Sequence, residues 1–185
     1  MTLRSKVWIG LASLMLAGTA ACAEPAMRID IDTGARSLTV YGADEQVLAR
    51  FDDISVGRGG VAAVHYKGDH STPLGHYRIV AVHRPHRYDT FYELDYPTPV
   101  HAELAYAAGR LKATARAAID AAHAAGHRPP SNTALGGGIG IHGIGQGSLA
   151  VHQAFNWTNG CVALTNEQLH SLGEWAVPGT AVDIR

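Results

Sequence analysis

The chain has 185 residues, of which 46% are hydrophobic and 17% are charged, and its formal net charge is −1. This composition is typical of one globular domain and excludes an intrinsically disordered chain, which combines low hydrophobicity with high net charge. The 15 Lys and Arg against 16 Asp and Glu lack the basic excess of most nucleic-acid-binding proteins, and two cysteines cannot form a disulfide-dense scaffold.

Residues 1–23 have the pattern of a secretory signal peptide. Arg4 and Lys6 form a short positive region, and the uncharged run 7–21 is shorter than the roughly 20 residues that cross a bilayer as a helix. Two routes of processing remain open: cleavage after residue 23, at an Ala-x-Ala site, or lipid modification of Cys22 as a new N-terminus. Both predict an exported domain in the periplasm or cell envelope, and only the second attaches it to a membrane.

Residues 27–185 form the predicted domain, and strands dominate its first half. The segment 27–32 alternates apolar and polar residues with a period of two, which indicates a half-buried strand, and 38–41 is the returning strand after a turn. Further strands are expected at 47–51, 54–56, 77–82 and 91–96, the last one ending before Pro97.

The pattern changes in the second half. The Ala-rich stretch 101–125 contains few helix breakers and predicts one helix that ends at Gly126. The run 165–168, Thr-Asn-Glu-Gln, fits a capping box that opens a short helix to about Trp175, and 181–184 is expected to be a last strand. The predicted fold is therefore mainly β with a helical insertion (α+β), in one domain.

Two patterns point to other functions but lack the context that those functions need. Residues 138–143 match GxGxxG, yet no helix is expected to open there and the β-α-β alternation of a dinucleotide-binding unit is missing. The histidine pairs His83/His86 and His123/His127 occur without an HExxH pattern or paired cysteines. We therefore expect neither a nucleotide cofactor nor a metal site.

Cys161 and His142 are the residues best suited to nucleophilic chemistry. Gly160 lets the backbone amide of Cys161 turn outward, and an apolar, strand-like run follows the cysteine. His142 ends an apolar run before Gly143, so a buried strand would place its imidazole at the edge of a cleft. A thiol beside an imidazole can become the reactive thiolate. The alternative for Cys161 is a small buried hydrophobic residue.

The surroundings of both residues resemble the L,D-transpeptidase (YkuD-type) catalytic domain family. The family motif has a His-Gly pair, a spacer and [Ser/Thr]-x-Gly-Cys, which correspond here to His142-Gly143 and to residues 158–161. An upstream stretch, 67–77, resembles the family's G-D-x-x-T-P-x-G-x-Y element. The resemblance runs from about residue 27 to 185 and implies an L,D-transpeptidase-like β-sandwich.

The resemblance also implies a mechanism. Cys161 is then the nucleophile that attacks an L,D amide of a peptidoglycan stem peptide and forms a thioester acyl-enzyme, and His142 is the general base and acid. The carbonyl of Gly143 orients His142, and backbone amides at Gly160 and Cys161 stabilise the oxyanion. No metal or other cofactor is required.

The acceptor and the outcome of the reaction stay open at this level. A second stem peptide or a lipoprotein as acceptor gives a cross-link or a protein attachment, and water gives hydrolysis by an L,D-specific hydrolase or carboxypeptidase. The family often has an Arg two residues after the cysteine, where this chain has Ala163, so it is open how the substrate is held. A non-catalytic wall-binding domain is a further alternative, whereas papain-like enzymes place Cys before His in the chain.

Five further residues are the expected substrate-binding groups: Trp157, Thr158, Asn159, Tyr96 and Lys67. Two of them have a structural alternative: a core position for Tyr96, as expected of an aromatic residue at a strand end, and a surface ion pair with Asp69 for Lys67. Packing is the alternative for Trp157, and local hydrogen bonding that sets the loop is the alternative for Thr158.

Overall fold

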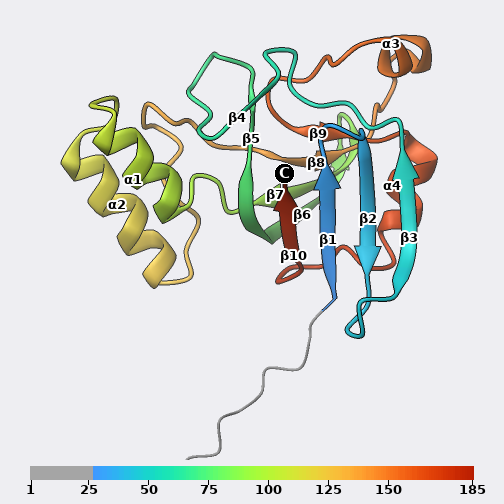
Figure 1. Cartoon of the computed structure of the whole chain (residues 1–185), viewed down its shortest axis with the longest axis horizontal. Coiled ribbons are helices and arrows are strands. Elements are labelled where there is room, and N and C mark those ends of the chain that lie inside the picture. The colour runs from blue at the N-terminus through green and yellow to red at the C-terminus, as the bar shows by residue number, and fades with distance from the viewer. Residues whose placement is uncertain (1–26) are drawn as a thin grey trace, which may run out of the picture.

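The computed structural model describes residues 27–185, and most of their strands belong to one eight-stranded sheet (Figure 1). The strand order is β3-β2-β1-β10-β6-β7-β8-β9. The strands are Arg28–Asp32 (β1), Ser37–Tyr41 (β2), Val47–Asp52 (β3), Gly75–His86 (β6), Asp89–Leu94 (β7), Gly140–His142 (β8), Val162–Ala163 (β9) and Ala181–Ile184 (β10). A separate pair joins Val61–Ala62 (β4) to Thr72–Pro73 (β5).

The predicted signal segment 1–23, with Cys22, lies outside the described residues. Within residues 27–185, no helix combines the length and the apolar character that a membrane span requires.

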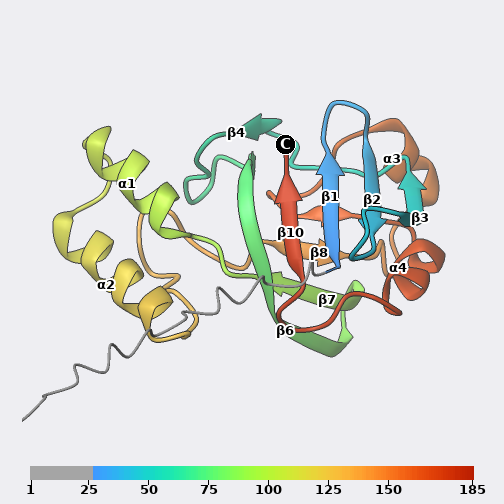
Figure 2. The same ribbon diagram turned by 60° about the horizontal axis from the view of Figure 1, so that its bottom comes forward.

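The long strand β6 joins the two halves of the sheet. It pairs with β10 on one side and with β7 on the other, and β7 and β8 run across the direction of β1 and β10 (Figure 2). The outer strand of the second half, β9, meets the segment after β3, where the amide of Ser55 donates to the carbonyl of Ala163 over 2.9 Å and the amide of Ala163 donates back over 2.7 Å. The sheet therefore folds back on itself around a shared core, which confirms the mainly β, sandwich-like prediction.

The core follows the predicted alternation in β1. Ile29 and Ile31 are fully buried, while the residues between and beside them are only partly buried. Ile141 of β8 and Val162 of β9 are also fully buried. Burying an aliphatic side chain of this size contributes roughly 1.5–3 kcal/mol, so these positions hold the two halves of the sheet together.

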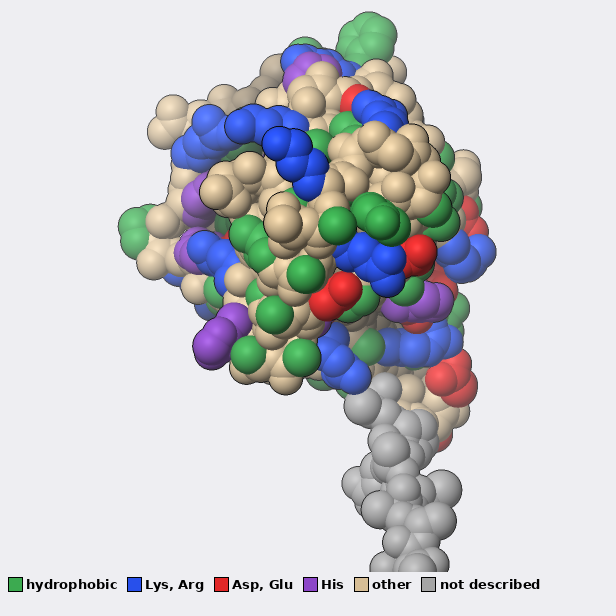
Figure 3. Space-filling view, turned by 90° about the vertical axis from the view of Figure 1, so that its left-hand side faces the viewer, with side chains coloured by type: hydrophobic (Ala, Val, Ile, Leu, Met, Phe, Trp, Pro, Cys, Tyr) green, Lys and Arg blue, Asp and Glu red, His purple; other side chains and the backbone are tan. Residues whose placement is uncertain are grey.

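The single helix predicted over 101–125 is in fact two helices. They are α1, Pro99–Ala107, and α2, Ala113–Ala124, and the chain between them passes through Gly109 in the left-handed region at φ 69°. Glycine adopts that conformation without the steric cost of a Cβ, so the turn forms inside an otherwise helix-favouring stretch. The two helices pack side by side at one end of the molecule, where small apolar side chains alternate with acidic and basic side chains and His (Figure 3).

Two short helices complete the fold. The predicted capping box is confirmed, since Thr165 accepts from the amide of Gln168 and the Gln168 side chain accepts from the amide of Thr165. This helix, α4, spans Asn166–Leu172 and ends earlier than predicted, at the C-cap Gly173. Helix α3, Leu149–Ala154, was not predicted, and Ser148 caps it. The segment 54–56, expected as a strand, forms only an isolated bridge at Ser55.

Candidate active site

The pairing of β8 with β9 positions His142 and Cys161. The two strands are parallel, with Ile141 opposite Val162 and His142 opposite Ala163. Side chains alternate between the faces of a sheet, so His142, Ala163 and the residue two before it, Cys161, all project from the same face. Every residue of β8 is buried, which agrees with the predicted buried strand that ends at a His-Gly corner.

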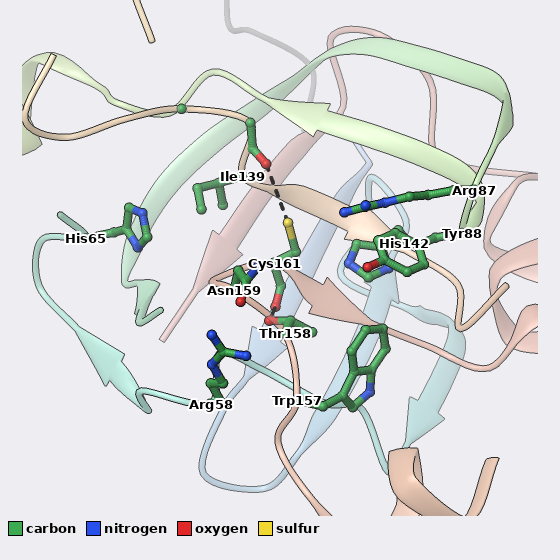
Figure 4. A pocket seen from close by; sticks show the side chains of 12 residues that line it. Arg58, His65, Arg87, Tyr88, Ile139, His142, Trp157, Thr158, Asn159 and Cys161 are labelled. Atoms are coloured by element: carbon green, nitrogen blue, oxygen red, sulfur yellow. Dashed lines mark hydrogen bonds between the residues drawn. The ribbon is translucent and has the colours of Figure 1, made fainter. Parts of the chain in front are cut away.

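The same face opens into a cavity of about 410 Å³ that both residues line (Figure 4). The other lining residues are Arg58, His65, Arg87, Tyr88, Gly137, Gly138, Ile139, Trp157, Thr158 and Asn159. The predicted association of the thiol and the imidazole in one pocket is therefore present.

The imidazole of His142 is held as a neutral base. Its Nδ1 lies 2.7 Å from the carbonyl oxygen of Gly143, and because a carbonyl can only accept, Nδ1 carries the hydrogen and Nε2 keeps its lone pair. The ring of Tyr88 stacks on the imidazole at a centroid distance of 4.4 Å, and the ring of Trp157 meets it edge-on at 5.6 Å. Burial lowers the pKa of His142 to about 4.

Cys161 is a partly exposed free thiol at the cavity wall. The sulfur donates a weak hydrogen bond to the carbonyl of Gly138 over 3.5 Å, drawn as a dashed line in Figure 4, and among the described residues it makes no hydrogen bond to His142. Burial raises the pKa of the thiol to about 11, although backbone hydrogen bonding and the positive charge of Arg87 act in the opposite direction. At neutral pH the site therefore contains a thiol and a neutral imidazole.

The loop before Cys161 is organised by Thr158. The buried hydroxyl of Thr158 donates to the carbonyl of Cys161 over 2.6 Å and accepts from the amide of Gly160 over 3.1 Å. This corrects the prediction for Gly160, because its amide is already engaged and is not free to stabilise an oxyanion. Gly160 has φ 126°, and a Cβ there would lie 2.7 Å from the carbonyl oxygen of Ser71. The loop therefore requires glycine for its shape.

The five residues predicted to bind substrate separate into two groups. Trp157, Thr158 and Asn159 line the cavity, although the hydroxyl of Thr158 is used within the loop. The prediction for Tyr96 is wrong, because it lies in the core at 2% exposure and donates its hydroxyl hydrogen to the carbonyl of His65. Lys67 is exposed beside Gly136 and does not line the cavity, so its role in substrate binding stays a prediction.

Residues 67–77, the upstream element that resembles G-D-x-x-T-P-x-G-x-Y, form hydrogen bonds that shape the chain beside the cavity. Thr72 accepts a hydrogen bond from the amide of Gly57 over 2.8 Å, and Tyr77 donates to the carbonyl of Pro73 over 3.0 Å. Asp69 accepts from the amides of Tyr66 and Ser71 rather than from Lys67. The element therefore shapes the chain next to the cavity.

Seven lining residues were not predicted from the sequence. Three of them, Gly137, Gly138 and Ile139, precede His142 in the chain, and the other four are Arg58, His65, Arg87 and Tyr88. Arg87 and Tyr88 lie in the turn between β6 and β7, and Arg58 lies in the segment after β3. No motif marks these positions, so only the pairing of distant segments brings them to the cysteine. Within residues 27–185, no three His, Cys, Asp or Glu residues are grouped in a way that could hold a metal ion.

Comparison with known proteins gives a family and several similar folds. Residues 26–184 match the family model YkuD, described as the L,D-transpeptidase catalytic domain. The structure is similar to the helical cell shape determining protein Pgp2 (K307A mutant) of Campylobacter jejuni, with a TM-score of 0.59 and 20% identity over 88% of this chain and 48% of that one. Bd1075 of Bdellovibrio bacteriovorus has a TM-score of 0.56 and 19% identity over 88% of this chain and 49% of its own.

A third similar structure is the C442S mutant of an Enterococcus faecium L,D-transpeptidase, with a TM-score of 0.51 and 12% identity over 86% of this chain and 50% of that one. At these identities the structures establish the fold, and this chain spans about half the length of each. No curated protein matches the sequence.

Proposed function

Since the chain belongs to the L,D-transpeptidase catalytic domain family, we propose that it is a cysteine-dependent L,D-transpeptidase acting on peptidoglycan stem peptides. The observation that carries this proposal is the shared cavity, in which the thiol of Cys161 lies near an imidazole whose Nε2 is free to accept a proton. A non-catalytic wall-binding domain has no need for a thiol and a neutral base in one cavity.

The first half of the proposed reaction forms a thioester. The thiol of Cys161 leaves the carbonyl of Gly138 and turns toward His142, whose Nε2 takes its proton as the sulfur attacks the carbonyl carbon of the scissile amide. The tetrahedral intermediate then collapses, the carbon–nitrogen bond breaks, and His142 returns the proton to the leaving amine. Gly143 holds the productive tautomer throughout.

The second half regenerates the thiol. An acceptor amine attacks the thioester carbonyl, His142 takes a proton from the attacking nitrogen, and the sulfur leaves and receives that proton. The product is an amide that joins acyl donor and acceptor. With water in place of the amine the same steps give hydrolysis.

The oxyanion of each intermediate needs backbone donors. Because the amide of Gly160 is engaged with Thr158, we assign this role to the amide of Cys161 itself. One such donor contributes roughly 3–4 kcal/mol to transition-state stabilisation in other enzymes.

Transfer is favoured over hydrolysis by a second cavity beside the first. It has a volume of about 320 Å³, and Arg87, Tyr88 and Trp157 form a wall common to both cavities. Ile144 and Val151 give the second cavity an apolar side. We assign it to the acceptor, a second stem peptide or a lipoprotein, because a bound acceptor there is next to the thioester and displaces water.

The proposed substrate also requires export, which we assign to residues 1–23, with processing after residue 23 or lipidation at Cys22. Fractionation of cells that express the full chain tests this, and protein confined to the cytoplasm contradicts it. The similar Campylobacter protein is known as a determinant of helical cell shape, and we propose a wall-modifying role of the same general kind here.

The decisive experiment is incubation of the purified protein with tetrapeptide-containing muropeptides, followed by mass spectrometry. A cross-linked dimer demonstrates transfer, and a product that has gained one water demonstrates hydrolysis. Intact protein mass detects an acyl group on Cys161. Cys161→Ala and His142→Ala should abolish both products, while the control His127→Ala, at an exposed histidine outside the cavity, should not. Full turnover by either site variant excludes the mechanism.

A further inference from the structure

The cavity around Cys161 has an unbalanced charge. Two arginines, Arg58 and Arg87, line it, and none of the residues that line it is an Asp or Glu. Among the described residues, neither arginine lies within ion-pair distance of a carboxylate, whereas Arg28, Arg50 and Arg116 all do. A cavity with two uncompensated guanidinium groups favours an anionic ligand.

Arg87 lies at the boundary between the two cavities. It occupies the turn between β6 and β7, and its guanidinium carbon is 4.5 Å from the centroid of the Tyr88 ring. That ring in turn stacks on His142. In Figure 4 the Arg87 side chain extends from its strand end toward Cys161. A guanidinium over an aromatic ring keeps the N–H groups at its edge available for hydrogen bonding.

Arg58 lies on the other side of the cysteine, next to Asn159 (Figure 4). Its backbone amide donates to the carbonyl of Thr158 over 2.9 Å, which ties it to the loop that carries Cys161. One guanidinium nitrogen donates to Nε2 of His70 over 2.9 Å, and an imidazole brings no negative charge that would compensate the guanidinium. The two arginines therefore approach the thiol from different elements.

The position where the family often has an arginine cannot supply this charge. Ala163 is fully buried, and its backbone pairs with Ser55 on one side and lies opposite His142 on the other. Its side chain projects from the same face as His142 and Cys161, but alanine carries no charge. The chain thus carries its cavity cations on other segments.

We propose that Arg58 and Arg87 form two carboxylate subsites, one on each side of the scissile amide, so that the enzyme selects a donor peptide with two carboxylates. This inference rests on the proposed function and names the groups that hold its donor. Guanidinium binds carboxylate through two parallel hydrogen bonds, which orients the peptide as well as attracting it. Anchoring the donor at both ends places the carbonyl between them at Cys161.

The test measures binding, so it does not depend on turnover. The full chain with Cys161→Ala is titrated with an acidic stem tetrapeptide and with two analogues, one amidated at the terminal carboxylate and one at an internal carboxylate. We expect each amidation to raise Kd about tenfold or more, since each one removes a charge-assisted hydrogen bond to a guanidinium. Arg58→Gln and Arg87→Gln, each added separately, should remove the dependence on one carboxylate, a different one for each.

Two further variants control for indirect effects. Arg87→Lys keeps the charge but loses the planar fork, so we expect intermediate affinity. Arg50→Gln removes an exposed arginine of β3 that pairs with Asp52, and it should change neither Kd nor its dependence on amidation. Melting temperatures of all variants establish that they are folded.

The outcomes separate this inference from the proposed function. If both glutamine variants keep the full dependence on both carboxylates, or lose dependence on the same one, the two-subsite proposal is wrong. If carboxylate-dependent binding is found but the wild-type protein never forms an acyl-enzyme, the two-subsite proposal is supported and the transpeptidase proposal is wrong. If turnover is normal and binding is insensitive to amidation, the transpeptidase proposal is supported and the two-subsite proposal is wrong.

Discussion

The ring of Tyr88 stacks on the imidazole of His142, with centroids 4.4 Å apart and planes inclined by 16°. The backbone takes part as well, since the amide of Gly143 donates to the carbonyl of Tyr88 over 3.1 Å. The turn between β6 and β7 therefore covers one face of the proposed base and anchors the residue that fixes its tautomer.

Removing this cover should change the pH dependence of the reaction. Burial holds the pKa of His142 at about 4, and the base must be unprotonated, so the wild-type kcat/KM should fall only well below pH 6.5. In Tyr88→Ala the imidazole of His142 becomes hydrated and the pKa of His142 rises. The acid limb of kcat/KM should therefore move up by about one pH unit or more. Measurement of kcat/KM from pH 4 to 8 checks this. Tyr88→Phe keeps the stacked ring and serves as the control, and an unchanged acid limb in Tyr88→Ala rejects this role for the tyrosine.

The buried imidazole should also make folding sensitive to acid. His142 has a folded pKa of about 4, below the ordinary value of 6.5, so the folded state disfavours its protonated form. This contribution to stability is fully present above pH 6.5 and is lost as the pH falls toward 4. The loss is on the order of 3 kcal/mol.

Urea unfolding of the wild type and of His142→Gln at pH 7 and pH 4.5 isolates that contribution. The wild type should lose more free energy of unfolding between the two pH values than the variant, which has no titrating group at this position. Equal losses show that the imidazole is hydrated in the folded protein.

Gly160 can be tested against a matched glycine. Both Gly160→Ala and Gly68→Ala place a Cβ on a residue with positive φ, but only the Cβ at 160 meets another group, at 2.7 Å from the Ser71 carbonyl oxygen. We expect each alanine to lower the free energy of unfolding by about 1 kcal/mol because of the backbone conformation. Gly160→Ala should lower it further and disturb the loop that carries Cys161. Thermal unfolding and acyl-enzyme formation measure the two effects. Equal behaviour of both variants means that the loop adapts without strain.

Thr158 should act by positioning the cysteine loop. Thr158→Val has nearly the same shape but removes the hydroxyl that serves Gly160 and Cys161, at a cost of roughly 1–3 kcal/mol. The rate of thioester formation should fall at least about tenfold while Kd for the donor changes little. Thr158→Ser keeps the hydroxyl and should retain most of the rate. If Kd instead rises with an unchanged rate, Thr158 contacts the substrate directly.

Local patterns in the sequence were sufficient for much of the fold. The alternation of Ile29 and Ile31 with polar residues predicted β1, and the Thr165–Gln168 capping box predicted the start of α4. These features depend on neighbours within a few residues, which a sequence displays directly. The break at Gly109 was missed because helix-favouring alanines surround a single glycine whose left-handed conformation is set by the packing of α1 on α2.

The chemistry of the site was visible in the sequence, but its shape was not. Cys161 and His142 stand out because few side chains can serve as nucleophile and base, and their flanking glycines and spacing carry a recognisable motif. Strand pairings between residues far apart in the chain bring Arg58, Arg87 and Tyr88 to the cavity. The same pairings place Tyr96 in the core. Such pairings depend on how the whole sheet folds back to bury its apolar faces, and no short stretch of residues contains that information.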